Sequence, residues 1–108
     1  MTSTSPPVEF HYVDEAYETK MAAFEIDCNE GRGEPLACHH VGEFYAVVKD
    51  DHKRASKVYE ENCLSKDFEA SCFNLGKLFL SGKGVPQDDN VAEALFGKRF
   101  YPTPSKLN

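Results

Sequence analysis

The sequence predicts an all-α fold, an α/α solenoid of stacked helical pairs with about five helices that disulfides brace. Three observations lead to this prediction. An internal repeat recurs about every 34 residues, apolar residues are spaced three and four positions apart, and cysteines occur in pairs on either side of polar turns. A helical unit of this length cannot bury its apolar face alone, so neighbouring units must stack.

The repeat is clearest when residues 38–45 are aligned with residues 72–79, at an offset of 34. Further along, residues 55–59 match residues 92–96 at an offset of 37. The extra residues fall in the loop 81–86, where insertions cost little. We interpret the matching positions other than the cysteines as packing positions. These positions are Gly42 and Gly76, Tyr45 and Phe79, Ala55 and Ala92, and Tyr59 and Phe96.

The first two helices are expected near residues 13–29 and 36–48. In both, apolar side chains recur at steps of three and four residues and therefore line one helix face. The segment 31–35, Gly-Arg-Gly-Glu-Pro, separates them because glycine and proline interrupt helices. Gly42 lies inside the second helix, where glycine is costly, so we expect a neighbouring helix to approach it closely.

Three further helices are expected near residues 52–63, 68–80 and 89–99, with the same apolar spacing. Gly76 lies inside the fourth helix and has the same interpretation as Gly42. The segment Gly82-Lys83-Gly84 lacks the frame of a phosphate-binding loop and is expected to form a turn with positive φ. Asp88 and Asp89 suit the start of the last helix.

These elements divide the chain into three parts. Residues 1–12 are expected to form a flexible N-terminal segment and residues 101–108 a proline-containing tail. The domain between them, residues 13–100, contains a first unit at about residues 34–66 and a second at about 68–100.

The composition excludes several classes of function. The chain has 108 residues, with 12 Lys and Arg against 18 Asp and Glu, for a net charge of −6. Nucleic-acid binding and attraction to anionic lipid both need basic clusters, so neither is expected. The longest apolar run, residues 44–48, is far shorter than the ~20 residues that span a bilayer, so no membrane span is expected.

The cysteines are expected to form the disulfides Cys28–Cys38 and Cys63–Cys72. In each pair, one cysteine ends a helix and the other begins the next, at similar distances from the turn of a helical hairpin. Such a crossing brings the Cα atoms within bridging distance. Each bridge would contribute about 2.7 kcal/mol in the chain-entropy model. A twin-cysteine helical hairpin would instead pair Cys28 with Cys72 and Cys38 with Cys63, and this alternative stays open.

The sequence assigns no catalytic residue, cofactor ligand or metal ligand. The cysteine spacing does not suit structural zinc, and the Cys-x-x-Cys-His pattern of covalent haem attachment is absent. The symmetry of the repeat argues against a catalytic thiol. Noncovalent haem stays open, although the four histidines are expected to be surface or capping residues. They are His11, His39, His40 and His52.

One unit carries a recognisable motif. The run Glu69–Phe79, with Ala70, Cys72, Leu75 and Gly76, precedes Gly82-Lys83-Gly84-Val85 and a helix with Ala92 and Phe96. It resembles the Sel-1-like repeat, an α/α relative of the tetratricopeptide repeat. The cysteine pairs are similar to those of the cysteine-rich subset of that family. Within that subset, the opening Val8-Glu9-Phe10, the acidic first helix and the run 55–63 resemble the cytochrome c oxidase assembly factor 7 family, over about residues 8–100.

The resemblance implies a non-enzymatic factor of the mitochondrial intermembrane space that supports assembly of respiratory complex IV. Its partners would be assembly components and, during import, an intermembrane-space oxidoreductase. Disulfide trapping in that compartment would reconcile the paired cysteines with residues 1–7, which resemble neither a signal peptide nor a presequence. Members of that family are longer, so this chain would be a short or truncated member.

Two other functions stay open. Bacterial cysteine-rich relatives of the repeat family are associated with β-lactam hydrolysis, although this chain has no Ser-x-x-Lys motif. A haem-linked or redox carrier is the other.

Overall fold

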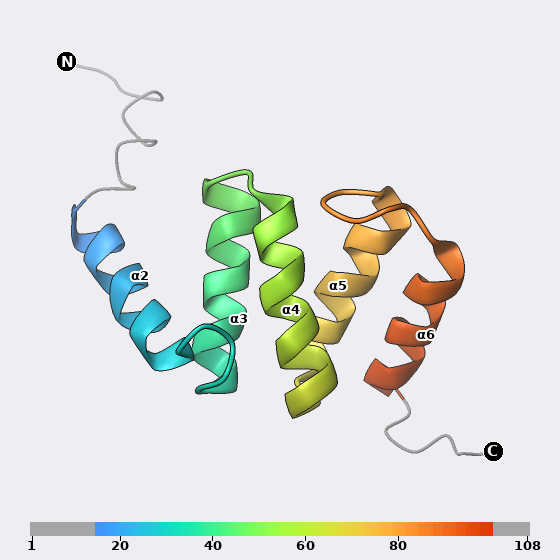
Figure 1. The fold of residues 1–108 in the computed structure, drawn as a ribbon, viewed down its shortest axis with the longest axis horizontal. Helices are drawn as coiled ribbons and strands as arrows, with labels where there is room; N and C mark the ends of the chain where they lie inside the picture. Colours follow the sequence, from blue (N-terminus) through green and yellow to red (C-terminus); the bar gives the residue numbers. More distant parts are fainter. Residues whose placement is uncertain (1–14, 101–108) are drawn as a thin grey trace.

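The computed structural model describes residues 15–100, with side chains described as far as Gly97. The described residues form five α-helices and one π-helical segment, with no strand among them. Figure 1 shows the helices side by side in chain order, from α2 to α6. The elements are α2 (Glu15–Cys28), α3 (Pro35–Glu43), η2 (Phe44–Val48), α4 (His52–Lys66), α5 (Glu69–Ser81) and α6 (Asp89–Phe100).

The expected all-α class and the five helices are confirmed. The flexible segment expected at 1–12, the first two residues of the expected first helix and the tail at 101–108 lie outside the described residues. The third helix is longer than expected and ends at Lys66. Its end is set by Asp67, which adopts a left-handed conformation and donates its backbone N–H to the carbonyls of Asn62 and Cys63.

The second expected helix changes character within its length. Residues 36–48 were expected to be one α-helix, but the α-helix ends at Glu43 and the last five residues form the π-helical η2. The backbone N–H of Lys49 donates to the carbonyl of Phe44, five residues earlier, at 3.1 Å. Asp50 follows with a φ of 54° and ends the element. A widened turn of this kind leaves no trace in an apolar spacing of three and four residues.

Carboxylate side chains begin several of the helices. Glu34 accepts a hydrogen bond from the backbone N–H of Ala37, and Pro35 occupies the first turn of α3. Asp51 does the same for Arg54 at the start of α4. Asp88 accepts hydrogen bonds from the backbone N–H groups of Asn90 and Val91, so it begins α6 as expected.

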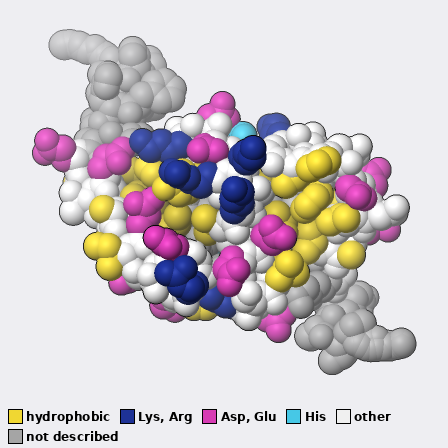
Figure 2. Space-filling model, in the orientation of Figure 1, with side chains coloured by type: hydrophobic (Ala, Val, Ile, Leu, Met, Phe, Trp, Pro, Cys, Tyr) yellow, Lys and Arg dark blue, Asp and Glu magenta, His cyan; other side chains and the backbone are white. Residues whose placement is uncertain are grey.

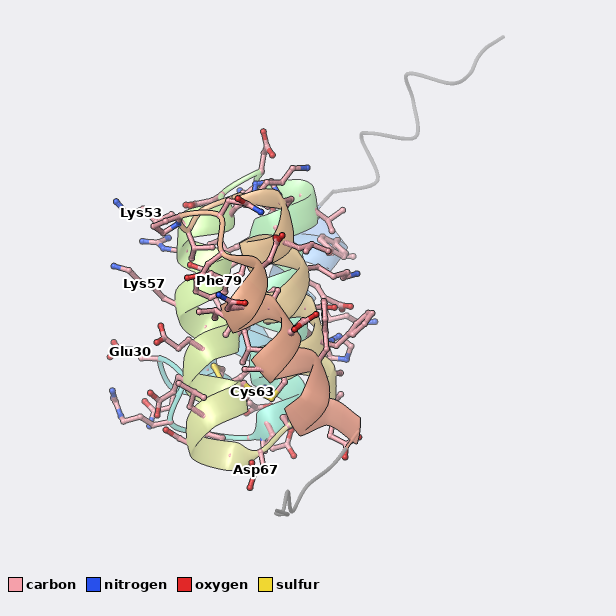
Figure 3. All side chains as sticks on the ribbon, turned by 90° about the vertical axis from the view of Figure 1, so that its right-hand side faces the viewer. Glu30, Lys53, Lys57, Cys63, Asp67 and Phe79 are labelled. Atoms are coloured by element: carbon pink, nitrogen blue, oxygen red, sulfur yellow. A yellow bond between two sulfur atoms is a disulfide. The ribbon has the colours of Figure 1, made fainter. Side chains whose placement is uncertain are left out.

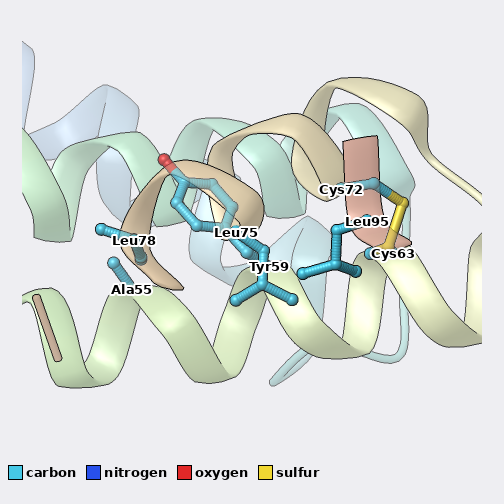
Figure 4. Packing of buried hydrophobic residues seen from close by; sticks show 7 residues of the cluster. All are labelled: Ala55, Tyr59, Cys63, Cys72, Leu75, Leu78 and Leu95. Carbon is cyan, nitrogen blue, oxygen red and sulfur yellow. A yellow bond between two sulfur atoms is a disulfide. The ribbon is translucent and has the colours of Figure 1, made fainter. Parts of the chain in front are cut away.

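Two clusters of buried side chains form the core, and each contains one disulfide. The smaller cluster contains Cys28, Ala37, Cys38 and Val41, from α2 and α3. The larger one draws on α4, α5 and α6, and Figure 4 shows its members with the Cys63–Cys72 bond at one end of the cluster. They are Ala55, Tyr59, Cys63, Cys72, Leu75, Leu78 and Leu95. Among residues 15–100, no helix is both long and apolar enough to cross a membrane.

The structure joins Cys28 to Cys38 and Cys63 to Cys72, with Cα–Cα distances of 4.6 and 4.7 Å. These are the sequential pairs that the hairpin spacing predicts, and the cross-motif pairing is not formed. Each bond fastens the end of one helix to the start of the next. All four cysteine side chains are buried.

The two interior glycines occupy equivalent places. Gly42 on α3 lies against the ring of Tyr59 on α4, and a Cβ added there would overlap the ring. Gly76 on α5 lies in the same way against the ring of Phe96 on α6. In both pairs, therefore, a glycine lets an aromatic side chain of the following helix approach the backbone.

Candidate functional site

A groove with a volume of about 400 Å³ lies between the end of α2, α3 and α4. We call it the Tyr45 groove. Buried apolar groups form part of its lining and charged side chains the rest. It is lined by Glu25, Cys28, Glu30, Gly31, Val41, Tyr45, Arg54, Lys57 and Val58.

Three polar side chains form a hydrogen-bonded chain across this groove. The Tyr45 hydroxyl donates to the carboxylate of Glu25 on α2 at 2.5 Å. Arg54 Nη1 on α4 donates to the same hydroxyl at 3.3 Å, and its guanidinium lies 4.9 Å from the centre of the Tyr45 ring. Tyr45 therefore links the two walls of the groove and holds the Arg54 guanidinium in a defined position.

The electrostatic surroundings keep the Tyr45 hydroxyl protonated. Burial raises the pKa of Tyr45 above its usual value of 10, and the hydrogen bond to Glu25 and the charge of Glu25 raise it further. Arg54 opposes these effects by favouring the phenolate. At neutral pH the hydroxyl is consequently a donor to Glu25 and an acceptor for Arg54.

The first turns of α4 carry three exposed cations, Lys53, Arg54 and Lys57, of which the last two line the groove. In the part of the chain that the structure describes, neither lysine has an ion-pair partner. Figure 2 shows Lys and Arg side chains gathered over this part of the face. In Figure 3, Lys53 and Lys57 project from the same edge of the molecule, with Glu30 further along it.

The second unit lacks these charges at the matching positions. Aligned at the offset of 37, the positions of Lys53, Arg54 and Lys57 hold Asn90, Val91 and Ala94. Apolar side chains are exposed on the right-hand part of the face in Figure 2, where α6 lies. The cation cluster is therefore a property of the first unit and not of the repeat.

A second group of polar side chains is buried where the two units meet. Ser71 Oγ on α5 lies 2.9 Å from His39 Nδ1 on α3, and it accepts a hydrogen bond from Asn62 Nδ2 on α4 at 2.9 Å. Asn62 Nδ2 also donates to the carbonyl of Pro35. The network ties together three helices, and Asn62 Oδ1 is a buried atom of it without a hydrogen-bond partner.

His39 corrects an expectation from the sequence. It was expected to be a surface or capping residue, but it is only 8% exposed and packs against the rings of Tyr59 and Phe68. Burial lowers the pKa of His39, although the nearby Glu43 carboxylate opposes this effect. The imidazole is thus neutral at neutral pH, with Nδ1 hydrogen-bonded to the Ser71 hydroxyl and Nε2 3.5 Å from the Glu43 carboxylate.

A serine beside a histidine also occurs in hydrolase sites, but this pair is differently placed. Ser71 has no exposed surface. A nucleophile must reach its substrate, so the Ser71 hydroxyl cannot act in this arrangement. Among residues 15–100, no group of three or more His, Cys, Asp or Glu side chains is placed to hold a metal ion.

The residues singled out from the sequence lie in the interior, and the Tyr45 groove contains few of them. Ala55, Ala92, Tyr59 and the four cysteines are buried, Tyr45, Phe79 and Phe96 partly so. Only Cys28 and Tyr45 line the groove. Sequence reasoning missed Arg54, Lys57 and Glu25. A local pattern could have indicated the cations, because this acidic chain places an arginine between two lysines that are four residues apart.

Comparison with known proteins gives three related sequences. The chain is 37% identical over 74 residues to the cytochrome c oxidase assembly factor 7 homolog of Drosophila melanogaster, which covers 68% of this chain and 27% of that protein. It is 38% identical over 75 residues to cytochrome c oxidase assembly factor 7 of Xenopus tropicalis, covering 64% of this chain and 32% of the relative. The human protein of that name is 25% identical over 87 residues, covering 77% and 38%.

These matches confirm the resemblance to proteins named cytochrome c oxidase assembly factor 7. The chain spans between 27% and 38% of the length of these curated relatives. No protein-family model matches the chain. No solved structure matches it either.

Proposed function

The chain is a homologue of the cytochrome c oxidase assembly factor 7 proteins, and on this premise we propose that it supports the assembly of respiratory complex IV. It would act without catalysis, as a helical scaffold that holds a partner protein. The observation that carries the proposal is the similarity to three curated proteins named as assembly factors, over about two thirds of this chain.

We propose the mitochondrial intermembrane space as its compartment. All four cysteines of the chain are joined in two disulfides. Structural disulfides persist where the surroundings are oxidising, which supports a compartment other than the cytosol. An oxidoreductase of the intermembrane space would form the two bonds after import, and folding would then retain the chain there.

We also propose that the helices form an α/α solenoid of Sel-1-like repeats. Each helix packs chiefly against its neighbours in the chain. The equivalent packing of Gly42 on Tyr59 and of Gly76 on Phe96 supports two copies of one structural unit. In a stack of this kind, the surface on one side can hold an extended partner.

Fractionation and co-purification test the proposal. The full chain, carrying an affinity tag, would be expressed in cultured animal cells. It should resist protease in intact mitochondria, become accessible once the outer membrane is opened, and co-purify with subunits of cytochrome c oxidase or their assembly partners. The double variant Cys63→Ser/Cys72→Ser is the matched control and should accumulate less. A cytosolic chain with free thiols would contradict the compartment and the role of the disulfides.

A hydrolase and a haem-linked or redox carrier are the two alternative functions. The curated relatives are named as assembly factors, so we do not favour a hydrolase. We propose that the chain works without a cofactor, and titration with haem tests this statement. A Soret band that saturates at one haem per chain would overturn it.

A further inference from the structure

We propose that the Tyr45 groove and the cations beside it form a docking site for a short acidic segment of a partner protein. The inference deepens the proposed function and rests on it for taking the partner to be a protein. Lys53, Arg54 and Lys57 would bind the carboxylates of that segment.

The acids of the groove are already engaged, which leaves the cations of α4 available. Glu25 accepts the Tyr45 hydrogen bond, and Glu30 lies 3.4 Å from Arg32. Lys53 and Lys57 have no ion-pair partner among the described residues. Glu61 lies near Gly31, beside the loop end of the groove. The positive charge is thus concentrated at the end of the groove near Lys53 and Arg54.

Arg54 is the positioned member of the cluster. The Tyr45 ring and hydroxyl hold its guanidinium, while the side chain as a whole is exposed. Only one hydrogen bond to a side chain is formed by this guanidinium within residues 15–100, so further N–H groups can meet a carboxylate. An arginine held in place beforehand loses less side-chain entropy on binding than a free one.

The charge of the whole chain favours a small acidic segment over a larger polyanion. With a net charge of −6, the molecule as a whole repels anions. Only a ligand that places a few carboxylates on this cluster and avoids the acidic remainder gains from it. A nucleic acid or an anionic membrane presents charge over a wider area and would meet that repulsion.

The matching positions in the second unit explain why the site would be single. Asn90, Val91 and Ala94 offer no positive charge, so an acidic segment has no equivalent place on α6. The difference fixes which end of the molecule the partner would contact. The acidic segment would bind the first unit and not the second, because only the first carries positive charge at these positions.

Titration of the isotope-labelled full chain with a short Glu/Ser peptide, followed by NMR, tests the site. We expect saturable shifts of backbone amides around Glu25, Tyr45 and residues 53–58, and weaker binding as salt rises. The matched Gln/Ser peptide should not bind. The double variant Arg54→Gln/Lys57→Gln should weaken binding about tenfold. The control Lys20→Gln/Lys77→Gln, which removes the same charge from two exposed positions on α2 and α5, should leave it within about twofold.

Three outcomes would overturn the inference. They are shifts that map to another surface, equal weakening in the two double variants, and tighter binding of a single-stranded oligonucleotide than of the peptide. The unchanged amide spectrum of each variant verifies that it folds. Because the peptide experiment uses the isolated chain, its failure would refute this surface alone, whereas failure to co-purify with assembly partners would refute the proposed function.

Discussion

The two sequence units of the molecule, α3–η2–α4 and α5–α6, have the same interior and different surfaces. Both place a glycine of the first helix against an aromatic ring of the second, and both bury an alanine completely. Outside, the first unit carries three cations where the second carries neutral side chains. The repeated positions therefore hold helices together, while the proposed docking site depends on positions that the repeat does not fix.

The units also differ in the segment that joins their two helices. In the first, the helices are joined through the π-helical η2 and a short turn. In the second, a longer loop joins them, with Gly82 and Gly84 at φ values of 71° and 76°. Gly84 lies directly against the backbone of His52, where a Cβ would overlap, so the longer loop packs on the start of α4. The insertion thus adds a contact between the units.

The disulfides give the largest expected contrast between the units. Replacing Cys63 and Cys72 together by alanine should lower the free energy of unfolding by about 3 kcal/mol or more, because the cross-link is lost and a cavity opens in the larger core cluster. The pair Cys28→Ala/Cys38→Ala affects the smaller cluster and should cost less. Urea unfolding followed by circular dichroism measures both. A larger loss from the second pair would show that the smaller cluster is the stronger one.

The interior glycines test whether the packing of the two units is equivalent. Gly42→Ala and Gly76→Ala should each destabilise the fold by about 1–3 kcal/mol, because the new methyl group forces Tyr59 or Phe96 to move. Gly97→Ala is the matched control. Nothing lies within 4 Å of a Cβ there, so alanine should stabilise α6 by up to about 1 kcal/mol. Thermal unfolding compares all three, and similar effects at Gly42 and Gly97 would refute the close approach.

His39 should make the stability of the first unit depend on pH, whereas Phe73 at the equivalent position of the second unit cannot titrate. Burial lowers the pKa of His39 below 6.5 in the folded chain, so the unfolded chain binds this proton more readily. The stabilisation that comes from burying the neutral imidazole is fully present above about pH 6.5, and it is lost as the pH falls toward the folded-state pKa. We expect the free energy of unfolding to fall more for the wild type than for His39→Phe between about pH 7 and pH 5.

Urea unfolding at several pH values provides the measurement. His40 and Glu43 face His39 and are present in both proteins, so only the difference between the two pH profiles reports on His39. Parallel profiles would show that the imidazole has an ordinary pKa. The variant also leaves Ser71 without its histidine partner, which lowers stability at every pH without changing the slope.

The sequence was sufficient for the parts of the fold that depend on periodic patterns. Apolar spacing located five helices, and the cysteine spacing indicated which sulfurs meet. It could not reveal η2, because a π turn depends on which carbonyl the Lys49 N–H selects. Nor could it place His39, because a histidine is buried only when partners such as Ser71, 32 residues away, arrive through tertiary packing.

Local sequence patterns could not predict the groove either. Its hydrogen-bonded chain combines Glu25, Tyr45 and Arg54 from α2, η2 and α4. Tyr45 was identified as a packing residue, and it does pack against both core clusters. Its hydroxyl, however, projects to a polar surface. A repeated aromatic position can thus serve the core with its ring and the surface with its hydroxyl, whereas its counterpart Phe79 has no polar atom.

The smallest expected effect concerns the relative ease of reducing the two disulfides. Lys66 Nζ lies 3.6 Å from Cys38 Sγ, and the Gly31 N–H donates to Cys28 Sγ at 3.1 Å. A nearby ammonium group lowers the pKa of an emerging thiol and makes it a better leaving group. In mild dithiothreitol, Cys28–Cys38 should therefore open a few times faster than Cys63–Cys72, as measured by alkylation and peptide mapping. Lys66→Gln should reduce the difference between the two reduction rates by a similar factor. Equal rates in the wild type would mean that burial, which is alike in the two pairs, governs access to both bonds.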